Sequence, residues 1–156
     1  MSDLDELLTL AAPPQDAPPP ADWDATPLAL PGDFRALVDR YGAGSFAGLG
    51  VLVPGHPNRF LDLLRQVEPQ RDALRTTDAP YPPDELLPWG IDENGNVAWW
   101  LMRGHWPVVG NEARGPEWLR HDGTVTSFLA GVLAGRIDPQ FLTMRGEVPF
   151  EPFPYE

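Results

Sequence analysis

The sequence contains no cysteine, and all 11 of its basic residues are arginines. Without cysteine there is no disulfide framework and no thiolate metal site, so a reducing compartment suits the chain. The start, MSDLDELLTL, lacks the basic segment of a secretory leader, and no apolar run approaches the ~18 residues that a membrane span needs. These absences predict a cytoplasmic protein without a membrane partner.

The 23 acidic residues outnumber the 11 arginines, which gives the chain a formal net charge of −12 at pH 7. Residues 1–24 hold six acids and residues 147–156 hold three, and neither segment contains a base. Phosphate affinity depends on clustered lysine and arginine, so direct binding to nucleic acid is not expected. An acidic surface suits a basic protein partner, or it serves solubility alone.

The 156 residues predict one domain with two flanking segments of different composition. We expect an acidic, proline-rich arm over residues 1–24, a body over residues 25–146, and an acidic, aromatic tail over residues 147–156. Ser2 caps at most a short turn in the arm, and the prolines that follow favour extended chain. The arm is interpreted as a solvated linker or as a docking segment, and the tail as a cover for the sheet near Trp100.

Apolar spacing predicts helices over residues 31–41, 59–75 and 124–134, with Pro69 interrupting the second. Strands are expected over residues 49–53, 107–110 and 117–121. A hairpin is expected over residues 87–101, with Asn94-Gly95 forming a type I′ turn. Together these elements predict an α+β fold: a central, mostly antiparallel sheet with helices packed on it, in a single domain.

The second strand of that hairpin carries apolar side chains on both faces. Val97, Trp99 and Leu101 share one face, and Ala98, Trp100 and Met102 share the other. Such a pattern is typical of a strand in the middle of a sheet that is covered on each side.

Catalytic and metal-binding patterns are missing from the sequence. His56, His105 and His121 form no pair with metal-ligand spacing. The adjacent acids at 84–85 and 92–93 point apart in extended chain, which is a poor arrangement for general acid–base work. We therefore expect no enzyme, no cofactor and no bound metal.

Loop acids around the hairpin are the candidates for contact with a basic partner, because recognition is commonly placed on loops of a rigid scaffold. They are Asp84 and Glu85 before the hairpin, Asp92 and Glu93 at its tip, and Glu112 and Glu117 around the next loop. Trp100, with Met102, would add an apolar patch if the tail left it uncovered. The alternative is that these are ordinary solvated acids and a core tryptophan.

Three segments together resemble the SUKH superfamily, a group of bacterial immunity proteins related to a yeast cell-wall assembly regulator. Leu30–Gly44 (LPGDFRALVDRYGAG) resembles the family's opening pattern LPxDYxxLxxxYGxG. Pro88-Trp89-Gly90, Asn94-Gly95, Trp99-Trp100 and Trp106–Val109 are similar to its middle section, and Thr126–Gly135 to its closing helix. Each piece is common alone, and the order and spacing are what make the likeness specific.

The resemblance, which spans about residues 23–137, implies an α+β fold and a role without catalysis. That role is to bind and neutralise a polymorphic toxin, often a nuclease, and here the acids would face a basic toxin domain. No fixed set of binding residues carries over, and the toxin and the oligomeric state stay open. A second reading is a cytoplasmic scaffold or regulator that holds an endogenous partner through the proline-rich arm.

Overall fold

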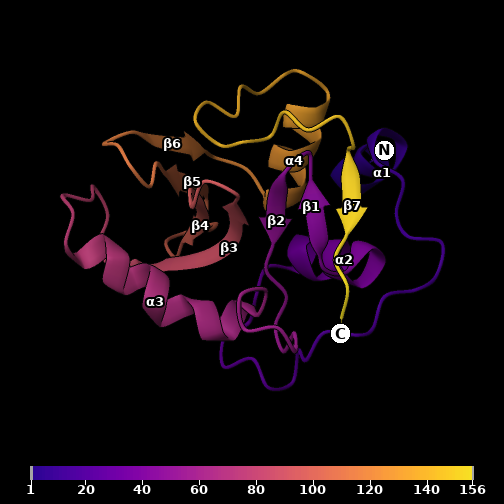
Figure 1. The fold of residues 1–156 in the computed structure, drawn as a ribbon, viewed down its shortest axis with the longest axis horizontal. Helices are drawn as coiled ribbons and strands as arrows, with labels where there is room; N and C mark the ends of the chain where they lie inside the picture. The colour runs from indigo at the N-terminus through magenta and orange to yellow at the C-terminus, as the bar shows by residue number, and fades with distance from the viewer. Residues whose placement is uncertain (1, 156) are drawn as a thin grey trace.

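The structure, a computed structural model that describes residues 2–155, is a seven-stranded antiparallel open sheet with four helices packed on it (Figure 1). This confirms the predicted α+β class. Met1 and Glu156, the outermost residues of the expected arm and tail, lie outside the described residues. The strand order is β6-β5-β4-β3-β2-β1-β7, and every neighbouring pair is antiparallel.

The strands are β1 (Gly44–Phe46), β2 (Leu49–Val51), β3 (Leu86–Asp92), β4 (Val97–Leu101), β5 (Val108–Asn111), β6 (Trp118–His121) and β7 (Phe150–Pro152). The helices are α1 (Asp3–Leu10), α2 (Gly32–Tyr41), α3 (Leu63–Arg75) and α4 (Val125–Leu133), with a short 3₁₀ turn η1 (Pro83–Glu85).

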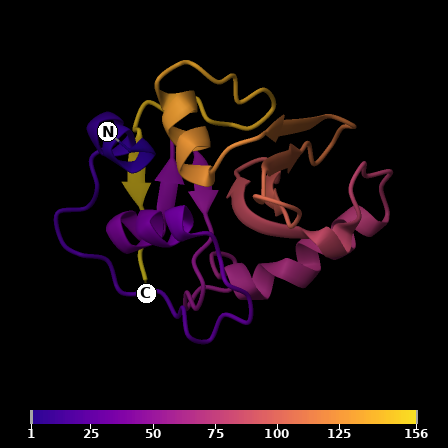
Figure 2. The same ribbon diagram turned by 180° about the vertical axis from the view of Figure 1, so that it is seen from behind.

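One face of the sheet is covered by α1, α2 and α4, which lie in front of the strands in Figure 2. The predicted stripe of α2 is confirmed: Phe34, Leu37, Val38 and Tyr41 are all buried. The Trp100 indole packs edge-to-face on Phe34, with ring centroids 4.8 Å apart. Trp100 is therefore covered by α2. The prediction that the tail covers the sheet near Trp100 was wrong.

The other face of β3, β4 and β5 is covered by the C-terminal half of α3, with Tyr81 and Trp118 packed beside it. Leu74 of α3 packs there with a separate cluster of sheet residues: Leu86, Val97, Trp99, Leu101 and Val109. The prediction of a central strand with two apolar faces is thus confirmed for β4. The residues of this cluster are buried, and the groove described below runs above them, between α3 and the β5–β6 turn.

The β3–β4 hairpin is present, but its turn type differs from the prediction. Gly95 has a φ of +82°, whereas Asn94 does not have a positive φ, so a type I′ turn is excluded. Gly95 N–H donates to the Asp92 carbonyl at 3.1 Å, and Asp92 N–H donates to the Asn96 carbonyl at 3.0 Å. A turn followed by a left-handed glycine is the usual three-residue hairpin loop.

Positive φ at both central residues occurs instead at Ala47 (+52°) and Gly48 (+111°), between β1 and β2. The residues before this turn, expected to be irregular, form β1. They do so because β2 on one side and β7 on the other supply hydrogen-bonding partners that local sequence cannot show.

Helix α3 begins four residues later than predicted. Asp62 caps it by accepting the Leu64 N–H at 3.1 Å, whereas a helix over residues 59–75 would have Asn58 as its cap. Pro69 lies inside the helix and does not interrupt it. Its position is exposed, as is that of Arg65 one turn earlier, so the carbonyl that loses its helical donor lies on the solvent side.

The first part of the expected arm is not a solvated linker. Ser2 and Asp5 form a capping box that starts α1. Leu7 is fully buried in the main core, and Tyr41 Oη donates to the Ala11 carbonyl at 2.7 Å. The interpretation failed because a short helix gains its stability from packing, which composition does not reveal.

The tail packs on the body, as expected, but at the edge of the sheet. Strand β7 pairs with β1, and Phe150 lies 4.8 Å from Phe46 and 4.9 Å from Tyr41, measured between ring centroids. Tyr155 Oη accepts the Ala43 N–H at 2.8 Å. The tail thus supplies an edge strand to the sheet.

Candidate partner-binding surface

The six predicted acids fall at opposite ends of β3. Asp84 and Glu85 lie in η1, at the start of the strand, and each is paired with an arginine. Asp84 Oδ1 accepts from Arg75 Nη2 at 2.9 Å, and Glu85 accepts from Arg103 through both carboxylate oxygens, at 2.8 and 2.7 Å. The Arg103 guanidinium holds the pKa of Glu85 below its usual range. Both acids are therefore paired within the chain, Glu85 with Arg103 and Asp84 with an arginine that also contacts Glu68 and Asp72.

Asp92, at the end of β3, is 5% exposed and is not available to a partner. One carboxylate oxygen accepts the backbone N–H groups of Asn94 and Asn96 at 2.9 and 3.0 Å. The other accepts Asn96 Nδ2 at 2.9 Å and the Thr143 N–H at 2.8 Å. Asp92 therefore organises the hairpin tip and ties it to the segment after α4.

The remaining acids lie around two turns that the structure brings together. Asn96 Oδ1 accepts the Ala113 N–H at 2.8 Å, which joins the β3–β4 turn to the β5–β6 turn. Glu93 lies in the first turn, and Glu112 and Glu117 flank the second. Within residues 2–155, none of these three carboxylates has a basic partner at ion-pair distance.

Trp100 contributes no surface patch. It is 1% exposed, beneath α2, and Met102 beside it is half-buried. The prediction that Trp100 meets a partner depended on an uncovered face, and the structure leaves that face closed.

Beside the C-terminal half of α3 runs a groove of about 440 Å³, here called the hairpin groove. It is lined by Gln70, Ala73, Leu74, Thr77 and Asp78 on the α3 side, and by Gly95, Val97, Trp99, Asn111, Glu112, Ala113, Gly115, Pro116 and Trp118 on the sheet side.

A second groove, of about 550 Å³ and here called the edge groove, lies beside the N-terminal half of α3. It is lined by Ser45, Gly48, Gly50, Leu52, Phe60, Leu61, Gln66, Gln70, Ile91, Asp92, Glu93, Glu151 and Phe153. Gln70 borders both grooves, so α3 forms a ridge between them. Neither set of lining residues includes an arginine or a histidine.

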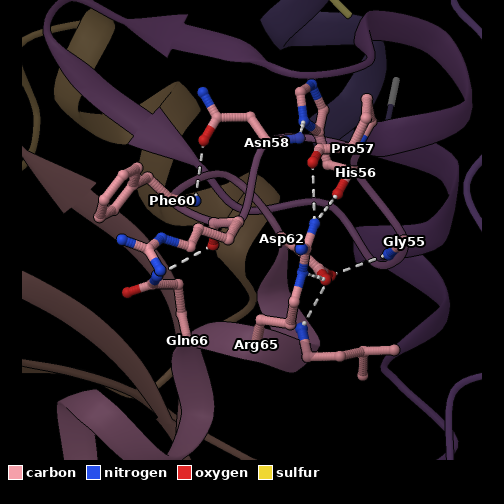
Figure 3. A network of polar contacts seen from close by, with 10 residues as sticks. Gly55, His56, Pro57, Asn58, Phe60, Asp62, Arg65 and Gln66 are labelled. Carbon is pink, nitrogen blue, oxygen red and sulfur yellow. Dashed lines mark hydrogen bonds and ion pairs between the residues drawn. The ribbon is translucent and has the colours of Figure 1, made fainter.

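The loop before α3 is held rigid by a polar network (Figure 3). Asp62 accepts the Gly55 N–H at 2.9 Å and Arg65 Nε at 2.6 Å. Arg65 Nη2 donates to the carbonyls of His56 and Pro57 at 2.8 and 2.9 Å. A carboxylate and a guanidinium therefore satisfy backbone groups on both sides of the loop.

This clamped loop presents Phe60 on the rim of the edge groove. Asn58 Oδ1 accepts the Phe60 N–H at 2.9 Å, and the Phe60 side chain is 63% exposed (Figure 3). The helix predicted over residues 59–75 would include Phe60, and that was wrong because α3 begins after it. The Asp62 cap, two residues before the Leu64 N–H that it binds, was the signal that could have placed it correctly.

The histidines lie in three different settings. His56, predicted to be a surface or loop residue, is in a loop but is only 2% exposed; burial lowers its pKa, and its Nδ1 accepts the Asn58 N–H at 3.0 Å. His121 Nε2 lies 2.8 Å from Ser127 Oγ, and His105 is exposed. Among the described residues, no group of His, Asp or Glu side chains could hold a metal ion. No described helix is both long and apolar enough to cross a bilayer.

No family model, no curated protein and no solved structure matches this chain. The surface around α3 is therefore interpreted from its own chemistry: two grooves with aromatic walls and carboxylates along their rims.

Proposed function

We propose that this protein is an immunity protein that binds and neutralises a toxin domain, with the surface around α3 as the contact area. The observation that carries the proposal is the lining of the two grooves, which combines carboxylates and aromatic side chains with no arginine or histidine. Aromatic side chains supply binding energy at protein interfaces, and unpaired carboxylates select a basic partner.

The position of the acids supports a protein partner in preference to a substrate. Glu93 and Glu112 lie on the rims of different grooves, and Gln70 on the α3 ridge lies between those grooves. A broad surface of this kind suits another protein, whereas small molecules bind in concave sites that enclose most of their surface. A nuclease with a basic phosphate-binding cleft would match it in charge.

The test begins with the neighbouring genes, where a secreted protein with a variable C-terminal toxin domain is expected. That domain is produced in a host with and without the full chain, and growth is compared. We expect the chain to restore growth and to bind the purified domain in a one-to-one complex by calorimetry.

Two variants then locate the contact. Replacing both Glu93 and Glu112 with glutamine should weaken binding, because these acids are unpaired. Replacing Glu85 with glutamine should leave binding unchanged, because both carboxylate oxygens of Glu85 already accept hydrogen bonds from Arg103. Absence of both rescue and binding for the toxin domain would refute the proposal.

A further inference from the structure

The hairpin groove combines apolar, aromatic and acidic side chains in one hollow of about 440 Å³. Its floor is apolar, formed by Val97 and by Trp99, whose Nε1–H is already bonded to Asn111 Oδ1 at 2.7 Å. Leu74 and Ala73 of α3 form one wall. Val97, Trp99 and Leu74 are already buried, so the accessible apolar lining comes from Ala73, Pro116 and Trp118. An aliphatic stem would bury apolar surface against these three residues.

An indole forms the opposite wall. Trp118 is half-buried and lines the groove, and its ring is held edge-to-face against Tyr81 with centroids 5.5 Å apart. A ring that is already fixed in place loses little freedom when a flat cationic group stacks on it. Tryptophan is the best of the aromatic residues for such stacking.

Carboxylates stand at two sides of the groove. Glu112 comes from the β5–β6 turn and Asp78 from the chain after α3. Among the described residues, neither has an arginine or histidine partner at ion-pair distance. Arg114 lies in the same turn as Glu112, but it does not line the groove. The lining therefore carries negative charge that no basic side chain of the described residues pairs with.

The Glu112 carboxylate occupies the space in which a side chain at position 115 would lie, and Gly115 has none. A Cβ placed on residue 115 would overlap Oε1 of Glu112 and lie 2.5 Å from its Cδ. The backbone at Gly115 does not have a positive φ, so alanine is compatible with its conformation. Replacing Gly115 therefore offers a way to move this carboxylate without removing its charge.

We propose that the hairpin groove binds an arginine side chain of the basic partner, an inference that rests on the proposed function. The guanidinium stacks on Trp118 and forms paired hydrogen bonds with Glu112, while the stem lies along Ala73 of α3. Arginine fits this arrangement better than lysine, because a planar guanidinium can stack and bind a carboxylate through two donors at once.

The probe is a blocked Gly-Arg-Gly peptide titrated into the full chain, with blocked Gly-Lys-Gly as its control. The readout is the NMR signal of the Trp118 indole N–H. We expect a saturable shift with the arginine peptide and several-fold weaker binding of the lysine peptide. A shift that does not saturate, or equal binding of the two peptides, would overturn the proposal.

Three variants assign the interaction. Their affinity for the arginine peptide is measured by calorimetry, because Trp118→Leu removes the indole signal. Glu112→Gln and Trp118→Leu should each weaken binding of the peptide about tenfold, and Gly115→Ala should weaken it by displacing the Glu112 carboxylate. Glu85→Gln, at the other end of β3, is the matched control and should bind as the wild type does. Equal losses in Glu112→Gln and Glu85→Gln would contradict a site in this groove.

The same variants separate the groove from the function. Failure of the peptide to bind, with growth rescue intact, rejects the arginine groove and leaves the immunity function standing. Saturable binding of the peptide without rescue of any neighbouring toxin rejects the immunity function and leaves the groove standing.

Discussion

The Asp92 carboxylate holds Asn96 by two hydrogen bonds, accepting the backbone N–H at 3.0 Å and the side-chain Nδ2 at 2.9 Å. Asn96 in turn accepts the Ala113 N–H at 2.8 Å and donates to the Phe141 carbonyl at 3.1 Å. This buried pair connects three loops that are distant in the sequence. Through the Ala113 bond it fixes the β5–β6 turn that carries Glu112.

Replacing Asp92 with alanine should lower the free energy of unfolding by about 3 kcal/mol, because buried N–H donors lose a charged acceptor. Urea denaturation measures the change. The matched control is Glu93→Ala, one residue later and exposed, which should change stability by no more than about 0.5 kcal/mol. Equal effects of the two substitutions would contradict the structural role given to Asp92.

Two phenylalanines provide a second matched pair. Phe34 is fully buried against Trp100, whereas Phe60 is 63% exposed. Phe34→Ala should cost about 3–5 kcal/mol, since it leaves a cavity beside the indole, and Phe60→Ala should be close to neutral. The same urea experiment tests both. A neutral Phe34→Ala would mean that α2 does not cover Trp100.

Stability should fall as the pH drops below about 6.5, because burial lowers the pKa of His56 and of His121 in the folded state. The unfolded chain then binds protons first, and the loss levels off once the pH is below the folded-state values. Thermal unfolding between pH 7.5 and pH 5 measures the slope.

Glutamine at both positions 56 and 121 should remove most of this slope, while His105→Gln, at an exposed site, should keep it. Carboxylates with a lowered pKa, such as those of Glu6 and Glu85, stabilise the fold while they are ionised, and this contribution is lost only below about pH 4.5. The pH range in which the carboxylates act is therefore separate from that of the histidines. A slope that survives the double substitution would assign the pH dependence elsewhere.

The edge strand β7 should depend on Phe150, whose ring is packed between Tyr41 and Phe46. Phe150→Ala should destabilise the fold by about 3 kcal/mol and raise hydrogen exchange at the edge of β1. Glu151→Ala, exposed in the same strand, is the control and should leave both unchanged. Unchanged exchange in Phe150→Ala would show that β7 holds by backbone hydrogen bonds alone.

Local patterns predicted those parts of the fold whose signals are short in range. The buried stripe of α2 follows from apolar residues at helical spacing. The two covered faces of β4 follow from an unbroken apolar run, because successive side chains of a strand point to opposite faces. The predicted start of α3 was wrong because Asn58 and Asp62 are both acceptable caps. In the folded chain the second is the cap, with Leu63 buried in the core and Asp62 also accepting the Gly55 N–H.

The candidate surface was predicted only in part, because sequence shows acids but not their partners. Glu112 and Glu93 remain candidates, whereas Asp84 and Glu85 are paired with arginines that lie 9 and 18 residues away in the chain. Asp92 was taken for a surface acid although it is buried: three of its four donors come from its own turn, but the fourth, the Thr143 N–H, comes from the segment after α4 that packs over it.

By itself, the sequence determined the class of fold, the acidic balance and the two-sided central strand, because each depends on composition or on spacing within one element. The tertiary structure decided which acids are free, which tryptophans are covered and where a groove lies. These depend on segments that are far apart in the chain, and a distant arginine or helix can neutralise or bury a residue without leaving any mark in the sequence around it.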